Sequence, residues 1–292
     1  MTSPPLSPTS VSTLLSQFQI RPSRAMGQNF VVDANTVRKV ARLAGVGPGD
    51  RVVEVGPGLG ALTVALAETG ASVKAIEADR HVLEALRAVI AGTGRGSLVE
   101  VVHADAMGIS WEDLLGVVPG WVLVANLPYN ISTPLIAGVL DGAPMIERMV
   151  VMVQREAGER LAASVGTAAY GAVSVKVAYW AEARVVSSVP ASVFLPRPNV
   201  ESVLVDIRRR QSPAVDVATA SYDEIFALVR AGFATRRKML RRALGPTVGA
   251  EAFELAGVDP QARAETLDVQ AWGKLAAAVR AVGAVGPGRT WS

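Results

Sequence analysis

The residues with the clearest chemical meaning are Asn126, Leu127, Pro128 and Tyr129, which follow the apolar run 121–125. The run predicts a buried strand, and open α/β sheets bind ligands at the carboxyl ends of their strands. The Asn126 side-chain carbonyl and the Leu127 backbone carbonyl could both accept a hydrogen bond from an exocyclic amino group. Pro128 has no N–H and a fixed φ, so it stiffens the turn. Because Tyr129 adds a flat face for stacking, the arrangement suits a planar amine such as adenine.

A glycine loop earlier in the chain favours this binding interpretation. Taken alone, Asn126–Tyr129 fits an ordinary proline turn equally well, since Asn and Pro are common in turns. However, the apolar run 51–55 is followed by Gly-Pro-Gly-Leu-Gly at 56–60 and by a helix-like pattern over 61–67. Strand, glycine loop and helix form the nucleotide-binding arrangement of a doubly wound sheet. Glycine lets the backbone approach a ligand closely, so we expect this loop to border one.

Two acidic residues follow the next two predicted strands. Glu77 lies 21 positions after Gly56, and an acid at that separation can accept hydrogen bonds from ribose hydroxyls. Asp105 follows the next strand, where it could accept from an adenine amino group. The loop departs from a dinucleotide fingerprint, because its third glycine comes one position early and Pro57 removes an N–H that a pyrophosphate would need. A nucleoside without phosphates, such as S-adenosylmethionine, fits better.

Composition narrows the class of protein. The chain of 292 residues is long enough for one large domain and a smaller one. Half of its residues are apolar, so a sizeable core can form. No apolar run is long enough for a membrane span, and the first twenty residues lack the features of a signal peptide. The chain has no Cys and only two His residues, which excludes disulfides, thiolate zinc sites and a Cys nucleophile. We therefore expect a cytoplasmic protein without a metal, with a flexible arm over residues 1–25.

The remaining pattern predicts an α/β domain followed by helices. Asp33 or Asn35 could cap a helix that begins near residue 34. Further strands are predicted over 149–153, 184–189 and 202–208, and further helices over 79–91, 133–141, 155–164 and 170–180. After a linker at 211–218, helices are expected over 222–231, 235–244, 249–255 and 269–282.

A one-sign cluster of charge lies among these last helices. Between Arg230 and Arg242 there are six basic residues and no acid. The overall net charge is only +3, so the uneven placement is more informative than the total. Such a cluster is a candidate phosphate-contact surface, and a solvated helix face is the alternative.

Four motifs make the chain similar to the ribosomal RNA adenine dimethyltransferases, from about Met26 to the C-terminus. They occur in that family's order, as Gly-Gln-Asn-Phe at 27–30, Glu-Val-Gly-Pro-Gly-Leu-Gly at 54–60, Asn-Leu-Pro-Tyr at 126–129 and Phe-Leu-Pro-Arg-Pro at 194–198. Residues 233–241 resemble the C-terminal motif of the branch that modifies small-subunit rRNA, although Met239 stands where Thr is expected. The resemblance implies a class I (Rossmann-like) methyltransferase sheet over 26–211 and a small helical RNA-binding domain over 212–292.

The resemblance also implies a role for each site residue. S-adenosyl-L-methionine would be bound by Gln28, Asn29, Val31, Gly56, Gly58, Glu77, Asp105 and Asn126. The target base would be held by Asn126, Leu127, Pro128 and Tyr129, with Phe194 as a second stacking face unless it fills the core. RNA would contact Arg236, Arg237, Lys238, Arg241 and Arg242. Val31 replaces the usual Leu but keeps an apolar contact. The implied reaction is dimethylation of the N6 amino groups of two adjacent adenosines near the 3′ end of small-subunit rRNA, by a monomer acting on the assembling subunit.

Three alternative functions stay open. A large-subunit rRNA dimethyltransferase that confers macrolide resistance is disfavoured by the full helical domain, by the Arg236–Lys238 cluster and by Gly27. A non-catalytic ribosome assembly factor is disfavoured by the intact Asn126–Tyr129 and glycine loop. A dehydrogenase is disfavoured by Pro57 and by the lack of an acid or base suited to hydride transfer. His103 more plausibly packs or hydrogen-bonds locally than acts in catalysis.

Overall fold

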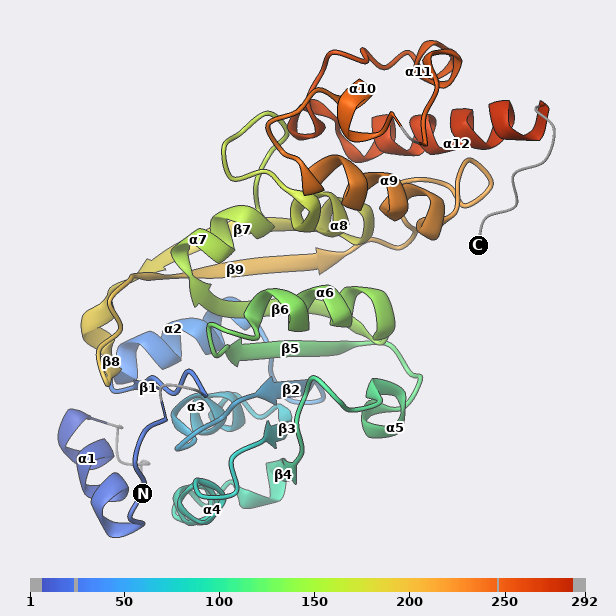
Figure 1. Ribbon diagram of the computed structural model, residues 1–292. Coiled ribbons are helices and arrows are strands. Elements are labelled where there is room, and N and C mark those ends of the chain that lie inside the picture. The colour runs from blue at the N-terminus through green and yellow to red at the C-terminus, as the bar shows by residue number, and fades with distance from the viewer. Residues whose placement is uncertain (1–6, 24–25, 246, 286–292) are drawn as a thin grey trace. The chain divides into compact units, whose positions relative to one another are not determined.

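The computed structural model describes residues 7–23, 26–245 and 247–285 (Figure 1). The chain divides into two compact units, one over Met1–Glu159 and Ala183–Arg209, the other over Arg160–Glu182 and Arg210–Ser292. These bounds differ from the predicted continuous domains 26–211 and 212–292. The difference arises because the segment 160–182 contributes Tyr170, Val175 and Tyr179 to the apolar core of the second unit.

The first unit contains a seven-stranded sheet in the order β4-β3-β2-β5-β6-β9-β7. The strands are β2 (Arg51–Val55), β3 (Ser72–Glu77), β4 (Val99–His103), β5 (Trp121–Asn126), β6 (Ile146–Gln154), β7 (Ala181–Val189) and β9 (Ser202–Arg209). Neighbours from β4 to β6 pair in parallel, and β9 runs antiparallel to β6. The strand order reverses between β2 and β5, which is the switch point where open sheets bind ligands. The predicted strands and their α/β arrangement are confirmed.

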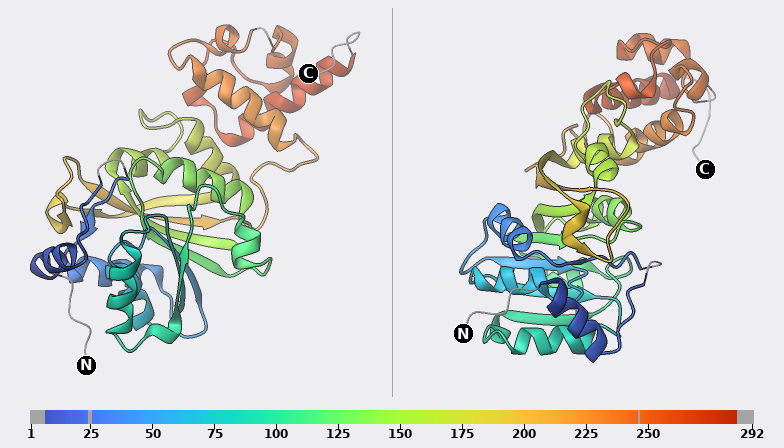
Figure 2. Two further views of the ribbon diagram at one scale, coloured as in Figure 1. Left: turned by 60° about the horizontal axis from the view of Figure 1, so that its bottom comes forward. Right: turned by 90° about the vertical axis from the view of Figure 1, so that its left-hand side faces the viewer.

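Helices cover both faces of this sheet (Figures 1 and 2). They are α2 (Ala34–Ala44), α3 (Ala61–Glu68), α4 (Leu83–Ala91), α5 (Trp111–Leu115), α6 (Ser132–Gly142) and α7 (Arg155–Leu161). Arg148 and Asp206 bond to each other, and Arg148 also donates to the last carbonyls of α2. Arg209 donates to carbonyls at the end of α6. Because successive strand residues point to opposite faces, α2 and α6 lie on opposite sides of the sheet.

The predicted cap of α2 is confirmed at Asp33. Its Oδ2 accepts a hydrogen bond from the Thr36 backbone N–H at 2.9 Å, which satisfies a free donor at the helix start. The helix ends at Gly45, whose φ of 65° is left-handed and favours glycine. The apolar face between these caps is buried, at Val37, Val40, Ala41 and Ala44.

Residues 7–17 are not a flexible arm, which corrects the prediction for that part of the chain. Helix α1 (Pro8–Gln17) begins at Ser7, which exchanges capping hydrogen bonds with Ser10. Val11 is fully buried and packs in one cluster with Phe30 and Leu59. Ser followed by Pro is a frequent helix start, and this was the local signal. Residues 1–6 and 24–25 of the predicted arm lie outside the described residues.

The second unit is helical. Its helices are α8 (Ala172–Trp180), α9 (Tyr222–Ala234), α10 (Leu240–Ala243), α11 (Ala250–Ala256) and α12 (Val269–Val285). The preference for helix over strand at 170–180 is confirmed. Tyr179, Phe226 and Trp272 lie in its core, with the rings of Tyr179 and Phe226 edge to face, a favourable aromatic geometry. Among the described helices of the chain, none has the length and apolar character needed to cross a bilayer.

The predicted helix over 235–244 is wrong. Helix α9 ends at Ala234, and the chain then turns through 235–238. Met239 forms an isolated β-bridge with Arg263, and the Leu240 N–H donates to the Ala262 carbonyl. These pairings use backbone groups that a continuous helix would need, so only the short α10 remains helical.

Short elements complete the structure. A two-residue strand β1 (Phe30–Val31) pairs antiparallel with β8 (Phe194–Leu195). Three 3₁₀ turns lie at Gly96–Leu98, Ala191–Val193 and Ala264–Thr266. The β1–β8 pair connects the segment before α2 with the loop before β9, and it therefore fixes the position of residues next to the site.

Candidate active site

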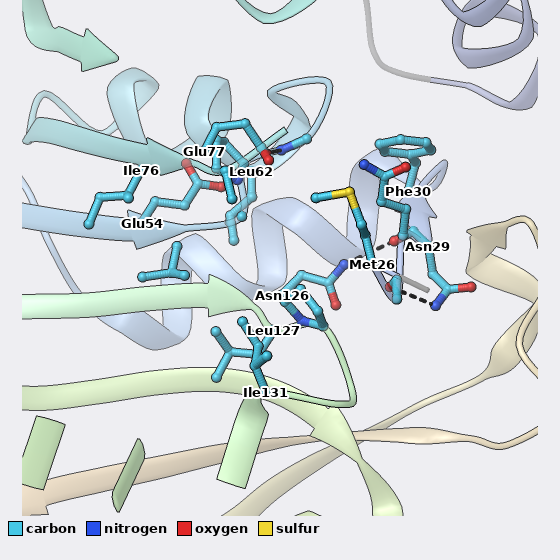
Figure 3. Close-up of a pocket in the computed structure, with 18 of the residues that line it drawn as sticks. Met26, Asn29, Phe30, Glu54, Leu62, Ile76, Glu77, Asn126, Leu127 and Ile131 are labelled. Atoms are coloured by element: carbon cyan, nitrogen blue, oxygen red, sulfur yellow. Dashed lines mark hydrogen bonds between the residues drawn. The ribbon is translucent and has the colours of Figure 1, made fainter. Parts of the chain in front are cut away.

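A pocket lies at the carboxyl ends of β2, β3, β4 and β5, and part of its lining is drawn in Figure 3. It is bordered by the segment before α2, the glycine loop, the ends of β3 and β4, and the turn after β5. The structure brings together eleven of the predicted residues here: Gln28, Asn29, Val31, Gly56, Gly58, Glu77, Asp105, Asn126, Leu127, Pro128 and Tyr129. They come from segments a hundred positions apart in the chain, so the fold alone makes them one site.

The glycine loop needs glycine at its key positions. Gly56, Gly58 and Gly60 have φ values of 70°, 56° and 85°, which residues with a Cβ rarely adopt. A Cβ on Gly58 would also come within 3.0 Å of the Phe30 ring. The loop therefore packs tightly against the N-terminal segment while its backbone borders the pocket.

Glu77 joins the end of β3 to the glycine loop. Its Oε2 accepts from the Gly58 N–H at 3.0 Å and its Oε1 from the Asp79 N–H at 2.8 Å. Burial raises the pKa of this carboxyl, although the backbone donors act in the opposite direction. The side chain is therefore held rigidly at the pocket wall, as a group that binds ribose hydroxyls requires.

Glu54 is a second buried carboxyl in the pocket wall and was not among the predicted site residues. Burial raises its pKa to about 8, and the charge of Glu77 acts in the same direction. Its Oε2 has no hydrogen-bond partner among the described residues. A buried polar atom without a partner is costly, and a ligand in the pocket could satisfy it. An acid within an apolar strand, just before the glycine loop, was the available signal.

The charges in the pocket favour a phosphate-free ligand. Glu77 and Asp105 line it beside Glu54, whose raised pKa keeps it largely protonated at neutral pH, and no Lys or Arg lines it among the described residues. A phosphate would meet carboxylates and find no cation, whereas the positive charges of S-adenosylmethionine would be stabilised. The residues present therefore fit this cofactor. No group of three potential metal ligands was found in the described part of the chain.

Asn126 is oriented by the N-terminal segment. Its Nδ2 donates to the Asn29 carbonyl oxygen at 3.1 Å, as Figure 3 shows. The Asn29 side chain in turn donates to the Gly27 carbonyl at 3.1 Å. Because its amide N–H is used in this way, Asn126 presents Oδ1 as an acceptor. The Leu127 carbonyl oxygen accepts no backbone hydrogen bond from the described residues, so two acceptors lie side by side in the chain.

The two predicted stacking residues have different surroundings. Tyr129 lines the pocket, and its hydroxyl is 2.9 Å from the Ser202 Oγ. Burial raises the pKa of this hydroxyl, and the ring is held in place. Phe194 is only 3% exposed, packs in a core cluster with Val31 and does not line the pocket. Its expected role as a second stacking face is therefore not supported, because the β1–β8 pairing turns it into the core.

Two residues of the N-terminal part of the chain, Val11 and Gln28, line the pocket. The Gln28 amide donates to Asp79 Oδ2 and accepts from the Ser23 N–H, both at 2.8 Å. It therefore fastens the N-terminal segment to the loop after β3. Val11 of α1 also lines the pocket, which the sequence analysis did not foresee.

The predicted RNA-contact residues belong to the second unit. Arg237, Lys238, Arg241 and Arg242 are exposed. Arg236 is different, because its guanidinium donates to Glu265 at 3.0 Å and to the Ala168 carbonyl. Four of the five basic side chains are thus exposed to solvent, whereas the Arg236 guanidinium stabilises the turn after α9.

Known proteins resemble most of the chain. A family model described as ribosomal RNA adenine dimethylase matches residues 19–280. Curated proteins named ribosomal RNA small subunit methyltransferase A include one from Streptomyces avermitilis, 47% identical over 93% of this chain and 92% of that protein. The protein of that name from Cutibacterium acnes is 45% identical over 96% of this chain and 95% of its own length.

Two solved structures have a similar fold. The 23S rRNA methyltransferase ErmE has a TM-score of 0.68 and 25% identity, over 86% of this chain and all of that one. A dimethyladenosine transferase from Plasmodium falciparum has a TM-score of 0.69 and 26% identity, over 84% of this chain and 95% of that one. These likenesses confirm the predicted methyltransferase fold.

Proposed function

Because the chain belongs to the ribosomal RNA adenine dimethylase family, we propose that it dimethylates the N6 amino groups of two adjacent adenosines near the 3′ end of small-subunit rRNA, with S-adenosyl-L-methionine as methyl donor. Relatives named for the small subunit are 43–47% identical over most of the chain, whereas the large-subunit enzyme ErmE is 25% identical. This difference favours the small-subunit substrate.

The pocket residues divide the work of holding the methyl donor. When bound, S-adenosylmethionine supplies a methyl group that its positive sulfur already activates. Glu77 accepts hydrogen bonds from ribose hydroxyls and Asp105 from the adenine amino group. Glu54, largely protonated at neutral pH because its pKa is raised to about 8, donates to a polar atom of the ligand.

The oriented amide of Asn126 is the observation that carries the proposal. An adenine amino nitrogen is a poor nucleophile, because its lone pair is delocalised into the ring. Hydrogen bonds from that amino group to Asn126 Oδ1 and to the Leu127 carbonyl favour a pyramidal, more reactive nitrogen. Tyr129 stacks on the base and fixes its direction. Positioning then supplies most of the acceleration.

Access to the adenosines sets the remaining requirements. An enzyme acts on a base that is unstacked or presented in a loop, and RNA loops offer such bases. The exposed basic residues of the segment 236–242 contact the phosphates of the substrate. We further propose that the protein acts as a cytoplasmic monomer on the assembling small subunit.

The test uses undermethylated small and large ribosomal subunits, incubated separately with radiolabelled S-adenosylmethionine and this protein. Mass spectrometry then locates the modified nucleotides. Two adjacent dimethylated adenosines in small-subunit rRNA are expected. Label on large-subunit rRNA would instead indicate a large-subunit dimethyltransferase of the kind that confers macrolide resistance. Tight binding without label would favour a non-catalytic assembly factor.

A further inference from the structure

Three arginines converge on one buried carboxylate on the α2 face of the sheet. Asp206 of β9 is 3% exposed, and its Oδ1 accepts from Arg148 at 2.7 Å. Its Oδ2 accepts from both Arg184 and Arg208 at 3.1 Å. Burial alone would raise the pKa of Asp206, but these arginines outweigh that effect and lower it. The carboxyl is therefore ionised, and the cluster carries two more positive charges than negative ones.

The three arginines have different tasks. Arg148 is mostly buried, and its other nitrogens donate to the carbonyls that end α2, so it serves the fold and balances Asp206. Arg184 and Arg208 are 67% and 58% exposed. Each is tied to the carboxylate through one nitrogen, which leaves further N–H donors for an outside group. Arg148 alone already balances the charge of Asp206, so charge balance does not explain the two exposed arginines.

Helix α2 extends the same surface. The Lys39 ammonium donates to the Ser187 hydroxyl of β7, which places this face of the helix next to the edge strand that carries Arg184. Arg42 lies one helical turn further on the same face and is exposed. Helix α2 contains no acidic residue. We call Lys39, Arg42, Arg184 and Arg208 the basic edge.

The basic edge is separate from the methylation pocket. Arg208 lies opposite Arg148 near the amino end of β6, whereas the pocket lies at the carboxyl ends of the parallel strands. None of the four residues lines the pocket. All four belong to the first unit, so this surface is also distinct from the segment 236–242.

We propose that the basic edge is a second phosphate-contact surface, which binds the backbone of the substrate rRNA away from the methylated adenosines. The nature of the RNA rests on the proposed function. Guanidinium groups pair with phosphates through parallel N–H donors, and a shared carboxylate holds two such groups next to each other. An acidic protein or an anionic membrane would meet the same charges, but the RNA substrate of the family favours RNA.

The test compares two double variants of equal charge. Arg184→Gln/Arg208→Gln neutralises the exposed arginines and leaves Arg148 to balance Asp206. The control, Arg87→Gln/Arg95→Gln, removes two exposed arginines in and after α4. Binding of undermethylated small-subunit rRNA is measured over a KCl series. The slope of log K against log salt is negative, and each lost phosphate contact reduces its magnitude by about 0.7–0.9. We therefore expect the magnitude of the slope to decrease by about 1–2 for the first variant and to stay unchanged for the control.

The outcomes separate this surface from the proposed function. An unchanged slope, an equal decrease in both variants, or a loss of binding only to anionic phospholipid vesicles would overturn the basic edge. If the first variant unfolds early in a thermal melt, Lys39→Gln/Arg42→Gln repeats the test without touching Asp206. If the wild type labels no small-subunit rRNA but the slope still decreases, the proposed function fails and the basic edge stands. Normal labelling with unchanged slopes refutes the basic edge alone.

Discussion

The pocket of the first unit and the basic segment 236–242 of the second use polar side chains in opposite ways. In the pocket, Glu77 and Asn126 are held by backbone groups at fixed distances. In the segment, the side chains of Arg237 and Lys238 are exposed, and within the described residues they have no hydrogen bond or ion pair. The pocket should therefore act through geometry, so that single changes have large effects. The segment should act through its charge, so that changes are small, additive and dependent on salt.

The largest effect is expected for Asn126→Ala. This change removes one of the two acceptors for the target amino group, and loss of one preorganised hydrogen bond at a reacting centre typically costs about 10²–10³ in rate. Cofactor affinity should fall only modestly. Single-turnover methyl transfer and cofactor titration measure the two effects, with exposed Asn35→Ala as the control. Wild-type turnover in Asn126→Ala would refute the role of this amide.

Glu77→Gln should have the next largest effect, on cofactor affinity. The substitution keeps the size of the side chain but removes the charge that accepts from Gly58, Asp79 and the ribose. Hydrogen bonds to charged groups contribute about 1.5–3 kcal/mol, so we expect affinity to fall by about tenfold or more in calorimetry. Glu100→Gln, an exposed change on the neighbouring β4, should leave affinity unchanged. An equal loss of cofactor affinity in both variants would show that the net charge of the protein, and not the position of Glu77, determines the affinity.

Within the basic segment, neighbouring arginines should behave differently. Arg237→Gln should weaken rRNA binding a few-fold at moderate salt and leave the stability of the protein unchanged. The slope of log K against log salt should become less steep by about 0.7–0.9. Arg236→Gln should instead lower the melting temperature, because it breaks the bonds to Glu265 and Ala168. Salt titrations and thermal melts on both proteins measure these effects. Identical behaviour would show that the segment is not organised as described.

The last prediction concerns stability rather than activity or binding, and it comes from the titration of Glu54. Its folded pKa of about 8 lies above the ordinary value of 4.5, so the folded state binds the proton more tightly. Its stabilising contribution is fully present below about pH 4.5 and is lost as pH rises through 8. The melting temperature should therefore fall from pH 5.5 to 8.5, and Glu54→Gln should weaken that dependence. A residual dependence from Glu77, whose pKa is also raised, is expected to remain.

The sequence predicted the site best where a local pattern, a buried strand followed by a turn, ends at a site residue. The run before Asn126 and the loop after Val55 each end a buried strand, and parallel strands bring such ends to one edge. The approximate positions of these strand ends, and the pocket residues on them, could therefore be predicted, whereas Gln28, Asn29 and Val31 were assigned to the site from the family resemblance. The raised pKa of Glu54 could not, because it depends on burial by residues that are distant in the sequence.

Long-range pairing explains the other differences. For Phe194 the sequence left a stacking face and a core position open, and pairing of β8 with β1 selects the core. The bridge between Met239 and Arg263 interrupts the helix predicted over 235–244, of which only α10 forms. Helix α1 has a good local start, but its place against Phe30 follows only from tertiary packing. For Phe194 and Met239, a contact across many residues outweighs the local signal.

The interleaving of the two units has a consequence for synthesis and for engineering. The sheet is completed by β9, which pairs with β6 but is translated only after the segment 160–182 of the helical unit. Because a chain emerges from its N-terminus, the first unit cannot finish folding until part of the second has already been made. For the same reason, a chimera that borrows the helical unit of a relative must exchange 160–182 together with 210–292 and leave the intervening segment 183–209 in place.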